Sequence, residues 1–535
     1  MTKVLIARYF WVNEIILFIL GWFMFLSFSG NMFIFSCSFE LRHIAKNAGL
    51  LWSPVLKKWY TPYYSIAINL KKYADDSALK EFKKSEIQIT DVAPETVWPK
   101  GLTPRPYQLG GVAHATTRSR CLLRHDPGTG KTIEAALCMN AIPGKTLIIC
   151  PPFLKINWMR EINTWCVPKR SVTLVETGEI KLYDLSVDVL IVPDSLVINS
   201  HVRQALIAHK FEWLFIDEIH RFKSHEAQRT LAVLGGQKGR TNYGGLIPLA
   251  KRVVGLTGTP MPARPIELWP MLNALAPQVI DHMTRFRYAE KYCNAFFDGF
   301  GWNLNGASHQ DELATRLKLN FMHTVKKSEV LTELPDKIYD QVFIDSSELK
   351  KDVASFDKQA MADFAIEDMT TKALGKLAAH RKDLGEAKAD FAIKYIKDLL
   401  ENSDESILVF AWHKSVLKKV CEKLAEFQPF LITGETPNKT RMEYVDEFQT
   451  NKNRRLFVGN IQAMGVGLTL TKATRVIFIE YSWTPSDNEQ AEDRCHRIGQ
   501  TRAVFIQYLV VNETIDEWVL DSIRAKQMNI KRIVG

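Results

Sequence analysis

The stretch "CLLRHDPGTGKTIEAALCM", residues 121–139, combines three successive elements of local structure. Its first three apolar residues predict a buried strand, "HDPGTGKT" predicts a glycine-rich loop, and "IEAALCM" has the composition of a helix. Gly128 and Gly130 allow backbone N–H groups to turn inward, where they can hold phosphate oxygens. The stretch therefore predicts a phosphate-binding loop between a strand and a helix of a parallel sheet.

The side chains of this loop fit a nucleoside triphosphate. Lys131 can supply a positive charge to the β- and γ-phosphates, and the hydroxyl of Thr132 can bind Mg²⁺. Thr129 lies between the two glycines and belongs to the same expected site. One position departs from the full G-x-x-x-x-G-K-[ST] pattern, because His125 stands where its first glycine is expected.

Two carboxylates follow a second apolar run, "WLFIDE", residues 213–218. Asp217 is expected to hold Mg²⁺, directly or through water, and Glu218 to orient or deprotonate an attacking water. A helix N-cap also uses acids, but a cap needs neither a buried strand nor two carboxylates. The threonines of "GLTGTP", residues 255–260, follow another strand and offer hydroxyls near a γ-phosphate.

The same alternation of short strands and helices fills most of the chain. With 535 residues the chain is too long for one ordinary core. Strand-like runs of the first series are "TLIIC", "VDVLIVP", "WLFIDE" and "RVVGLTG". After a mostly helical, charged region, the second series is "SILVFAW", "PFLIT", "RRLFVGN", "RVIFIE" and "FIQYLVV". This rhythm predicts an α/β protein with two parallel-sheet domains, whose ligands bind at the carboxyl ends of the strands.

Composition limits the partners and the compartment. The formal net charge is +10, with 69 basic and 59 acidic residues, which favours a polyanion such as nucleic acid as partner. The eight cysteines lie far apart and contain no CxxC pair, so we expect no structural metal and no disulfide framework. They indicate an intracellular, reducing location: cytoplasm, nucleoid or nucleus.

The N-terminal segment from Ile15 to Phe39 contains no charged side chain and is long enough to span a bilayer. It fits a membrane anchor, a signal peptide or a start assigned upstream of the true one, with Met32 as initiator. We favour the third, with an anchor second, because export would remove the predicted nucleotide site from ATP. A membrane role is expected only if residues 1–31 are a real anchor.

A small unit follows this segment. The stretch from 37 to 75 alternates two expected helices with an aromatic strand, "KKWYTP". Tryptophans and tyrosines alternate there with lysines, a combination that can stack bases and bind phosphates, although in a small domain the rings equally suit its core.

Near the other end of the chain, "QAEDRCHRIGQ", residues 490–500, allows three interpretations. Cys495 and His496 are adjacent, a spacing that does not suit two metal ligands on one helix face. Glu492 and Asp493 fit a solvated helix face. Arg494 and Arg497 are three residues apart and would share a face of a helix, as a pair of arginines for a phosphate requires.

The ordered series of motifs resembles the superfamily-two helicase-like ATPases of the SWI/SNF type. The resemblance covers roughly residues 101 to 520, and its motifs are "RPYQLGGV", "DPGTGKT", "IICPPFLKINWMREINTW", "DEIHRFKS", "LTGTP", "ILVFAWHKSVL", "VGNIQAMGVGLTLT" and "QAEDRCHRIGQ". It implies two RecA-like parallel-sheet lobes in tandem with a helical insertion, after a small N-terminal α+β module. The expected boundaries are 1–31 for the apolar segment, 32–80 for the module, 81–100 for a linker, 101–335 for the ATP-binding lobe, 336–387 for a helical connector and 388–535 for the C-terminal lobe.

The resemblance also implies roles for single residues. Gln108 would read the adenine of ATP, and His220 would couple the carboxylates to the rest of the site. In the second lobe, Gly465 and Gly467 would face the nucleotide, while Arg494 and Arg497 would reach across the cleft. The implied DNA contacts are Pro151, Trp158 and Trp483, although tryptophans such as Trp158 also suit a core.

The function implied is an ATP- and Mg²⁺-dependent translocase on duplex DNA, a monomeric motor that remodels or reanneals branched DNA. "NAGLLWSPVLKKWYTP" resembles the small HARP-type recognition module of annealing helicases. Thr324 and Val325 depart from the family, which often has arginines there. The alternatives are a strand-separating DNA or RNA helicase and an ATP-gated DNA clamp or adaptor with little turnover.

Overall fold

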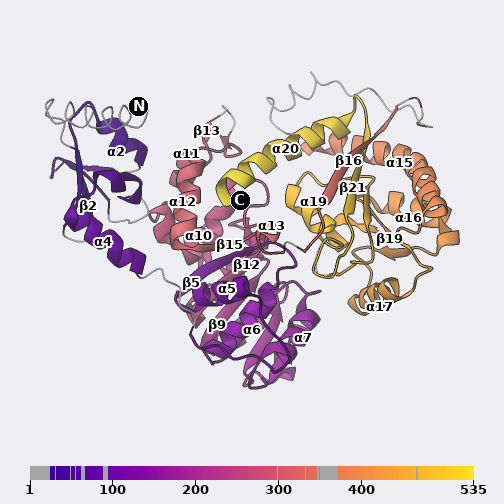
Figure 1. Ribbon diagram of the computed structural model, residues 1–535, viewed down its shortest axis with the longest axis horizontal. Coiled ribbons are helices and arrows are strands. Elements are labelled where there is room, and N and C mark those ends of the chain that lie inside the picture. The colour runs from indigo at the N-terminus through magenta and orange to yellow at the C-terminus, as the bar shows by residue number, and fades with distance from the viewer. Residues whose placement is uncertain are drawn as a thin grey trace, which may run out of the picture. The chain divides into compact units, whose positions relative to one another are not determined.

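The protein is described by a computed structural model, shown as a ribbon in Figure 1. The described residues are 24–29, 32–48, 50–54, 56–61, 67–87, 94–297, 299, 301–331, 333–345, 347, 349, 371–464 and 468–535. They form two compact units, a small N-terminal module and a larger body that holds two parallel sheets. The fold class predicted from sequence is therefore confirmed.

The module contains a four-stranded antiparallel sheet in the order β1-β2-β4-β3. Its elements are β1 (Phe25–Ser29), β2 (Met32–Ser36), α2 (Arg42–Ala48), β3 (Leu51–Ser53), β4 (Lys58–Thr61), the 3₁₀ helix Ile68–Tyr73 and α4 (Asp76–Ile87). Leu26, Phe33 and Phe35 are buried in its core. Because β1 pairs with β2, the sheet begins inside the stretch that we expected to be a separate apolar segment.

The anchor interpretation rests mainly on residues 1–23, which lie outside the described residues. Within the described part of the chain, none of the helices combines the length and the apolar composition that crossing a bilayer requires.

The first lobe of the body has a parallel sheet in the order β15-β5-β12-β9-β6-β8-β7. Its strands are β5 (Arg120–His125), β6 (Thr146–Cys150), β7 (Val172–Leu174), β8 (Val189–Pro193), β9 (Phe211–Asp217), β12 (Ala250–Thr257) and β15 (Met322–Val325). Its helices are α5 (Pro106–Thr116), α6 (Lys131–Ala141), α7 (Lys155–Trp165), α8 (Ser200–Ile207), α9 (Gln228–Val233), α10 (Trp269–Leu275), α11 (Arg285–Tyr292), α12 (Gln310–Asn320) and α13 (Lys327–Val330). Two short hairpins accompany them: β10 (Gly236–Lys238) with β11 (Thr241–Tyr243), and β13 (Phe296–Phe297) with β14 (Trp302–Asn303).

The second lobe has a parallel sheet in the order β16-β21-β20-β17-β19-β18. Its strands are β16 (Lys337–Ile344), β17 (Ile407–Ala411), β18 (Phe430–Ile432), β19 (Leu456–Asn460), β20 (Arg475–Phe478) and β21 (Val504–Val511). Its helices are α15 (Thr371–Asn402), α16 (Lys414–Lys423), α17 (Asn438–Thr450), α18 (Ile461–Met464), α19 (Pro485–Glu492) and α20 (Ile515–Val534). Figure 1 shows this lobe in orange and yellow, with α15 beside α16.

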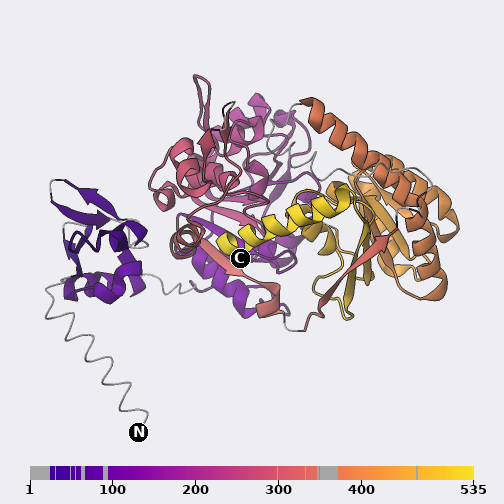
Figure 2. The ribbon, with the colours of Figure 1, turned by 90° about the horizontal axis from the view of Figure 1, so that it is seen from above.

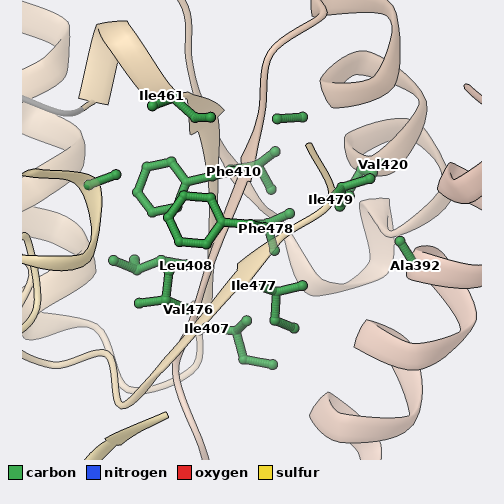
Figure 3. Packing of buried hydrophobic residues seen from close by; sticks show 14 of the residues in the cluster. Ala392, Ile407, Leu408, Phe410, Val420, Ile461, Val476, Ile477, Phe478 and Ile479 are labelled. Atoms are coloured by element: carbon green, nitrogen blue, oxygen red, sulfur yellow. The ribbon is translucent and has the colours of Figure 1, made fainter. Parts of the chain in front are cut away.

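The core of the second lobe shows why these runs form strands. The residues of β17 and the apolar residues of β20 are buried and lie side by side in the sheet, and the rings of Phe410 and Phe478 stack with centroids 5.2 Å apart (Figure 3). Burying one such side chain stabilises the fold by about 1.5–3 kcal/mol. A continuous apolar run between two helical layers therefore predicts a central strand of a parallel sheet.

The expected helical connector, 336–387, differs from the structure. Strand β16 pairs along its whole length with β21, from Lys337 opposite Val504 to Ile344 opposite Val511. It is an edge strand, and Tyr339 and Phe343 are exposed, so its local pattern did not reveal the long-range pairing. Figure 2 shows α20, in yellow, reaching from the second lobe toward the first, where Arg532 forms an ion pair with Asp311.

Candidate nucleotide site

The predicted phosphate-binding loop joins β5 to α6. Gly128 and Gly130 have φ of +84° and +93°, a left-handed conformation that side chains with a Cβ rarely adopt. Lys131 opens α6, and its Nζ donates to the carbonyl oxygens of His125, at 2.6 Å, and Asp126, at 3.4 Å. Burial lowers the pKa of Lys131, while Glu218 and Asp217 nearby raise it. The loop thus holds a lysine close to two carboxylates.

Gln108 lies against this loop. Its Nε2 donates to the carbonyl of Thr129 at 3.1 Å, and its Oε1 accepts the backbone N–H of Arg105 at 2.8 Å. A Cβ on Gly130 would collide with the Gln108 amide, so this position also needs glycine for space. The structure therefore joins Gln108 to the loop, and its role in reading adenine stays a prediction.

His125, which departs from the glycine pattern, is buried behind the loop. Its ring nitrogens lie 3.0 Å from the Glu134 carboxyl and 2.8 Å from Nδ1 of His323. Burial lowers the pKa of His125 and raises that of Glu134, so both groups favour their neutral forms. The histidine therefore fills the space between the loop and β15, where the usual pattern has a glycine.

Asp217 ends β9 and is buried. Its Oδ2 accepts the indole N–H of Trp158 at 2.8 Å, and its Oδ1 accepts the backbone N–H of Glu218 at 2.9 Å. Burial, and then the charge of Glu218, raise the pKa of Asp217. Two hydrogen bonds thus fix the orientation of a carboxylate in a place where a cation would relieve negative charge.

Glu218 has a φ of +48°, in the left-handed region that is costly for a glutamate. Burial would raise its pKa, but the hydrogen bond from His220, the charge of His220 and the charge of Lys131 lower it overall. The Nδ1 of His220 lies 3.3 Å from Oε2 of Glu218 and 2.8 Å from Oγ1 of Thr257. The structure therefore holds Glu218 ionised, with His220 as its neighbour.

This chain of polar groups continues to the second lobe. The backbone N–H of Thr259 donates to Oγ1 of Thr257 at 3.0 Å, and Nε2 of Gln490 donates to Oγ1 of Thr259 at 3.4 Å. The threonines of "GLTGTP" thus connect His220 with α19.

The two arginines of "QAEDRCHRIGQ" follow α19, which ends at Glu492, so they stand on turns and not on a helix as predicted. Both still point the same way, because Nη1 of Arg494 and Nη1 of Arg497 donate to the carbonyl of Leu468, at 3.3 and 3.2 Å. Burial lowers the pKa of both guanidinium groups. The second lobe thus presents two cations in one place.

The two halves of the site meet. Cγ of Arg497 lies 3.2 Å from where a Cβ on Gly128 would stand, so this arginine rests on the phosphate-binding loop. Glu218 lies close enough to both arginines for its charge to raise the pKa of Arg497 and for Arg494 to lower the pKa of Glu218. Residues predicted from separate motifs therefore come together around one site. Gly465 and Gly467 lie outside the described residues.

Sequence reasoning missed the residue that bridges the lobes beside this site. The backbone N–H of Lys327 donates to Oδ2 of Asp126 in the loop, at 2.9 Å. Its Nζ lies 2.8 Å from Oδ1 of Asp493 and donates to the carbonyl of His496 at 2.8 Å. No local pattern marks Lys327, because its partners lie on other motifs.

Glu492 and Asp493 are buried, so the solvated helix face expected for them is wrong. Lys337 lies 2.9 Å from a carboxylate oxygen of each. Burial opposes ionisation of Asp493, but the charges of Lys327 and Lys337 lower its pKa. These ion pairs hold the arginine segment against β16 and the end of the first lobe.

Not all of the residues that we expected to contact DNA lie at the surface. Trp158 is fully buried, so the prediction that its side chain contacts DNA is wrong. Its ring packs in the apolar core of the first lobe, and its N–H donates to Asp217. Pro151 is also buried, which likewise contradicts a contact by its ring. Trp483 is half-buried, packs on Trp518 with ring centroids 5.0 Å apart, and stays a prediction.

Relatives match this chain over most of its length. The DNA annealing helicase and endonuclease ZRANB3 of Mus musculus is 33% identical over 433 residues, which cover 77% of this chain and 39% of that protein. The SWI/SNF-related matrix-associated actin-dependent regulator of chromatin subfamily A-like protein 1 of Xenopus tropicalis is 33% identical over 433 residues, covering 79% of this chain and 44% of that protein. The chain thus spans about two fifths of the length of these curated relatives.

A solved structure, the Sulfolobus solfataricus SWI2/SNF2 ATPase core in complex with dsDNA, is 20% identical, with a TM-score of 0.39, and covers 81% of this chain and 97% of that chain. Family comparison matches residues 107–384 to the SNF2-related domain and residues 388–499 to the helicase conserved C-terminal domain. Because the first match alone spans more than half of the 535 residues, the chain belongs to the SNF2-related family of helicase-like ATPases.

Proposed function

We propose that this chain is an ATP-driven motor on duplex DNA that remodels or reanneals branched DNA. The observation that carries the proposal is the meeting of two half-sites: Arg497 of the second lobe rests on Gly128 of the phosphate-binding loop. A nucleotide bound there would contact both lobes. Hydrolysis would then change the attraction between them, as a two-lobe motor requires.

The first lobe would bind and orient ATP. The backbone N–H groups of the loop and the ammonium of Lys131 would hold the phosphates, exchanging the carbonyls that Lys131 contacts in this structure. Thr132 and Asp217 offer hard oxygen donors that fit Mg²⁺, which takes few protein ligands and completes its shell with phosphates and water. When bound, this ion neutralises charge on the phosphates. Glu218, ionised beside His220, would orient or deprotonate the attacking water.

The second lobe would act in the transition state. Arg494 and Arg497 donate to one carbonyl in this structure, and small rotations would turn their guanidinium groups to the γ-phosphate. An arginine placed in this way contributes about 10³ to 10⁵ to turnover. Loss of the phosphate would remove the shared charge, and the lobes would part.

Alternating closure would step the protein along the DNA backbone, whose contacts are independent of sequence and sensitive to salt. The name of one relative, a DNA annealing helicase and endonuclease, supports reannealing as the output. We infer a reducing intracellular compartment, since all eight cysteines are free and six are buried. The motor itself is proposed to be a monomer.

The N-terminal module would recognise the branch point. Trp52 on β3 is exposed and pairs with Trp59 on β4, and their rings lie edge to face with centroids 5.4 Å apart. A protein without residues 1–80 should keep its basal ATPase and lose activity on forks. Equal fork activity after the deletion would contradict this role.

The testing experiment is an ATPase assay with single-stranded DNA, duplex DNA, forked DNA and RNA side by side. We expect the strongest stimulation by duplex and forked DNA, and none for Lys131→Ala. Reannealing of a bubble and unwinding of a tailed duplex, followed on the same preparation, separate the motor from a strand-separating helicase. Absence of stimulation by any nucleic acid would favour the ATP-gated clamp and overturn the proposal.

A further inference from the structure

The first lobe displays aromatic side chains outside its core, on the hairpin β13–β14 and on the neighbouring helix α11. Their exposed fractions are 52% for Phe296, 57% for Phe297, 50% for Trp302 and 41% for Phe286. Phe286 meets Trp302 edge to face with centroids 4.6 Å apart, and Phe297 lies 5.9 Å from Trp302. A cluster of aromatic side chains that are about half exposed to solvent indicates an interaction surface.

Buried side chains and hydrogen bonds fix the elements that carry these rings. Tyr288 and Tyr292, on the opposite face of α11, are buried, and the hydroxyl of Tyr288 donates to the carbonyl of Pro265 at 2.9 Å. At the foot of the hairpin, Ser308 donates its N–H to Tyr292 and its hydroxyl to Lys291, at 2.9 and 2.6 Å. The aromatic cluster is therefore displayed in a fixed position.

Three arginines accompany the cluster. Arg285 and Arg287 flank Phe286 in sequence, and Arg264 hydrogen-bonds to Asn305 just after β14. Arg287 forms an ion pair with Glu290, and both side chains are exposed. Arg264 also lies near Lys526 of α20, whose pKa falls through burial and then through the charge of Arg264. Arg264 and Lys526 thus lie close to one another, with the carboxylate of Glu267 also near Lys526.

We propose that the hairpin binds unpaired bases at a DNA junction, with Phe297 and Trp302 stacking on bases and Arg285 and Arg287 holding the adjoining phosphates. Exposed rings beside arginines are what single-stranded nucleic acid requires, since every base has a π-face and every linkage a negative charge. Bases of an intact duplex are stacked on one another, so this surface selects the unpaired arm. The inference rests on the proposed function and names the part of a branched substrate that the first lobe would hold.

The test measures binding by fluorescence anisotropy, without nucleotide, of a fork with two unpaired arms and of a blunt duplex of the same sequence. Phe297→Ala with Trp302→Ala should weaken fork binding by at least about tenfold, because loss of one base stack costs roughly fivefold to a hundredfold in affinity. Duplex binding should change less than about twofold. Trp302→Phe, which keeps a ring, should restore most of the fork affinity.

Leu182→Ala is the matched control, because Leu182 is a single exposed apolar residue of the same lobe. It should leave both affinities unchanged. Thermal melting checks the fold, and Phe296→Ala with Phe297→Ala replaces the first variant if Trp302→Ala lowers the melting temperature. Duplex-stimulated ATPase activity, measured alongside, tests only the proposed function. Its absence in the unaltered protein would contradict the motor function, whereas the fork affinities would still test whether the hairpin binds unpaired bases.

Unchanged fork affinity in both double variants, or equal losses on fork and duplex, would overturn the proposal. A change confined to self-association in sedimentation would overturn it too, since the cluster would then be a docking face for protein.

Discussion

In the first lobe the carboxylates of the candidate site are oriented by side chains of the same lobe, whereas in the second lobe the two arginines stand on a segment that ion pairs to other parts of the chain hold in place. Lys131 lies near Asp217 and Glu218, and Trp158 holds Asp217 from behind. Arg494 and Arg497 instead donate to Leu468, and ion pairs around Asp493 hold their segment in place. One half is organised by its own sheet, and the other by contacts between the lobes.

This difference predicts a division of labour. Groups that are already organised should bind the nucleotide and its metal ion, and groups that arrive with the second lobe should act on the transition state. Substitutions in the first lobe should therefore change affinity together with turnover. Substitutions in the second lobe should change turnover at nearly constant affinity.

The largest effect is expected for Arg494→Ala. Turnover at saturating duplex DNA should fall by about 10³-fold or more, because the guanidinium stabilises developing charge, while affinity for a fluorescent ATP analogue stays within about threefold. Arg502→Ala, at an exposed arginine close by in sequence, is the control and should leave both values unchanged. Equal losses of affinity and turnover would contradict the division.

A smaller effect is expected for Lys327→Met, which keeps the length of the side chain and removes the ammonium from Asp493 and His496. Misplacing the arginine segment by about 1 Å should lower turnover by up to roughly a hundredfold. Lys326→Met is the matched control, because Lys326 is partly exposed and lies 3.9 Å from Glu329. If both substitutions lowered turnover alike, Lys327 would have no special role between the lobes.

The smallest effect is expected for Trp158→Phe, which keeps a smaller aromatic ring in the core and loses the N–H group that donates to Asp217. A less firmly oriented Asp217 should raise the Mg²⁺ concentration for half-maximal binding of the ATP analogue and lower turnover by about tenfold. Trp213→Phe is the control, because it removes a partly buried indole hydrogen bond of the same length, to the carbonyl of Ile142 at 2.8 Å, away from the site. A shift in Mg²⁺ requirement with this control as well would point to general loosening of the lobe.

The sequence predicted those parts of the site that sit where a strand ends. Asp217, Glu218 and Lys131 each follow an apolar run, and parallel strands bring such ends to one edge of a sheet. The central strands could also be predicted, because a strand that is buried on both faces has a continuous run of apolar residues.

The remainder depends on pairings between distant segments. Lys327 and Lys337 reach Asp493 over more than 150 residues, and no periodic pattern records such a pairing. Trp158 was expected at DNA, because its motif fixes its place after β6 but not the side of α7 that faces the core. The edge strand β16 was missed because its exposed residues break the apolar run.

The central claim, that both lobes act on the same phosphates, is tested most directly by a double-mutant cycle between Lys131→Ala and Arg494→Ala. Duplex-stimulated turnover of the four proteins is measured at saturating ATP and DNA. Groups that serve one transition state are strongly non-additive, so the double variant should be about as slow as the slower single variant. Losses that multiply would mean that the two residues act independently, and the two-lobe site would be wrong.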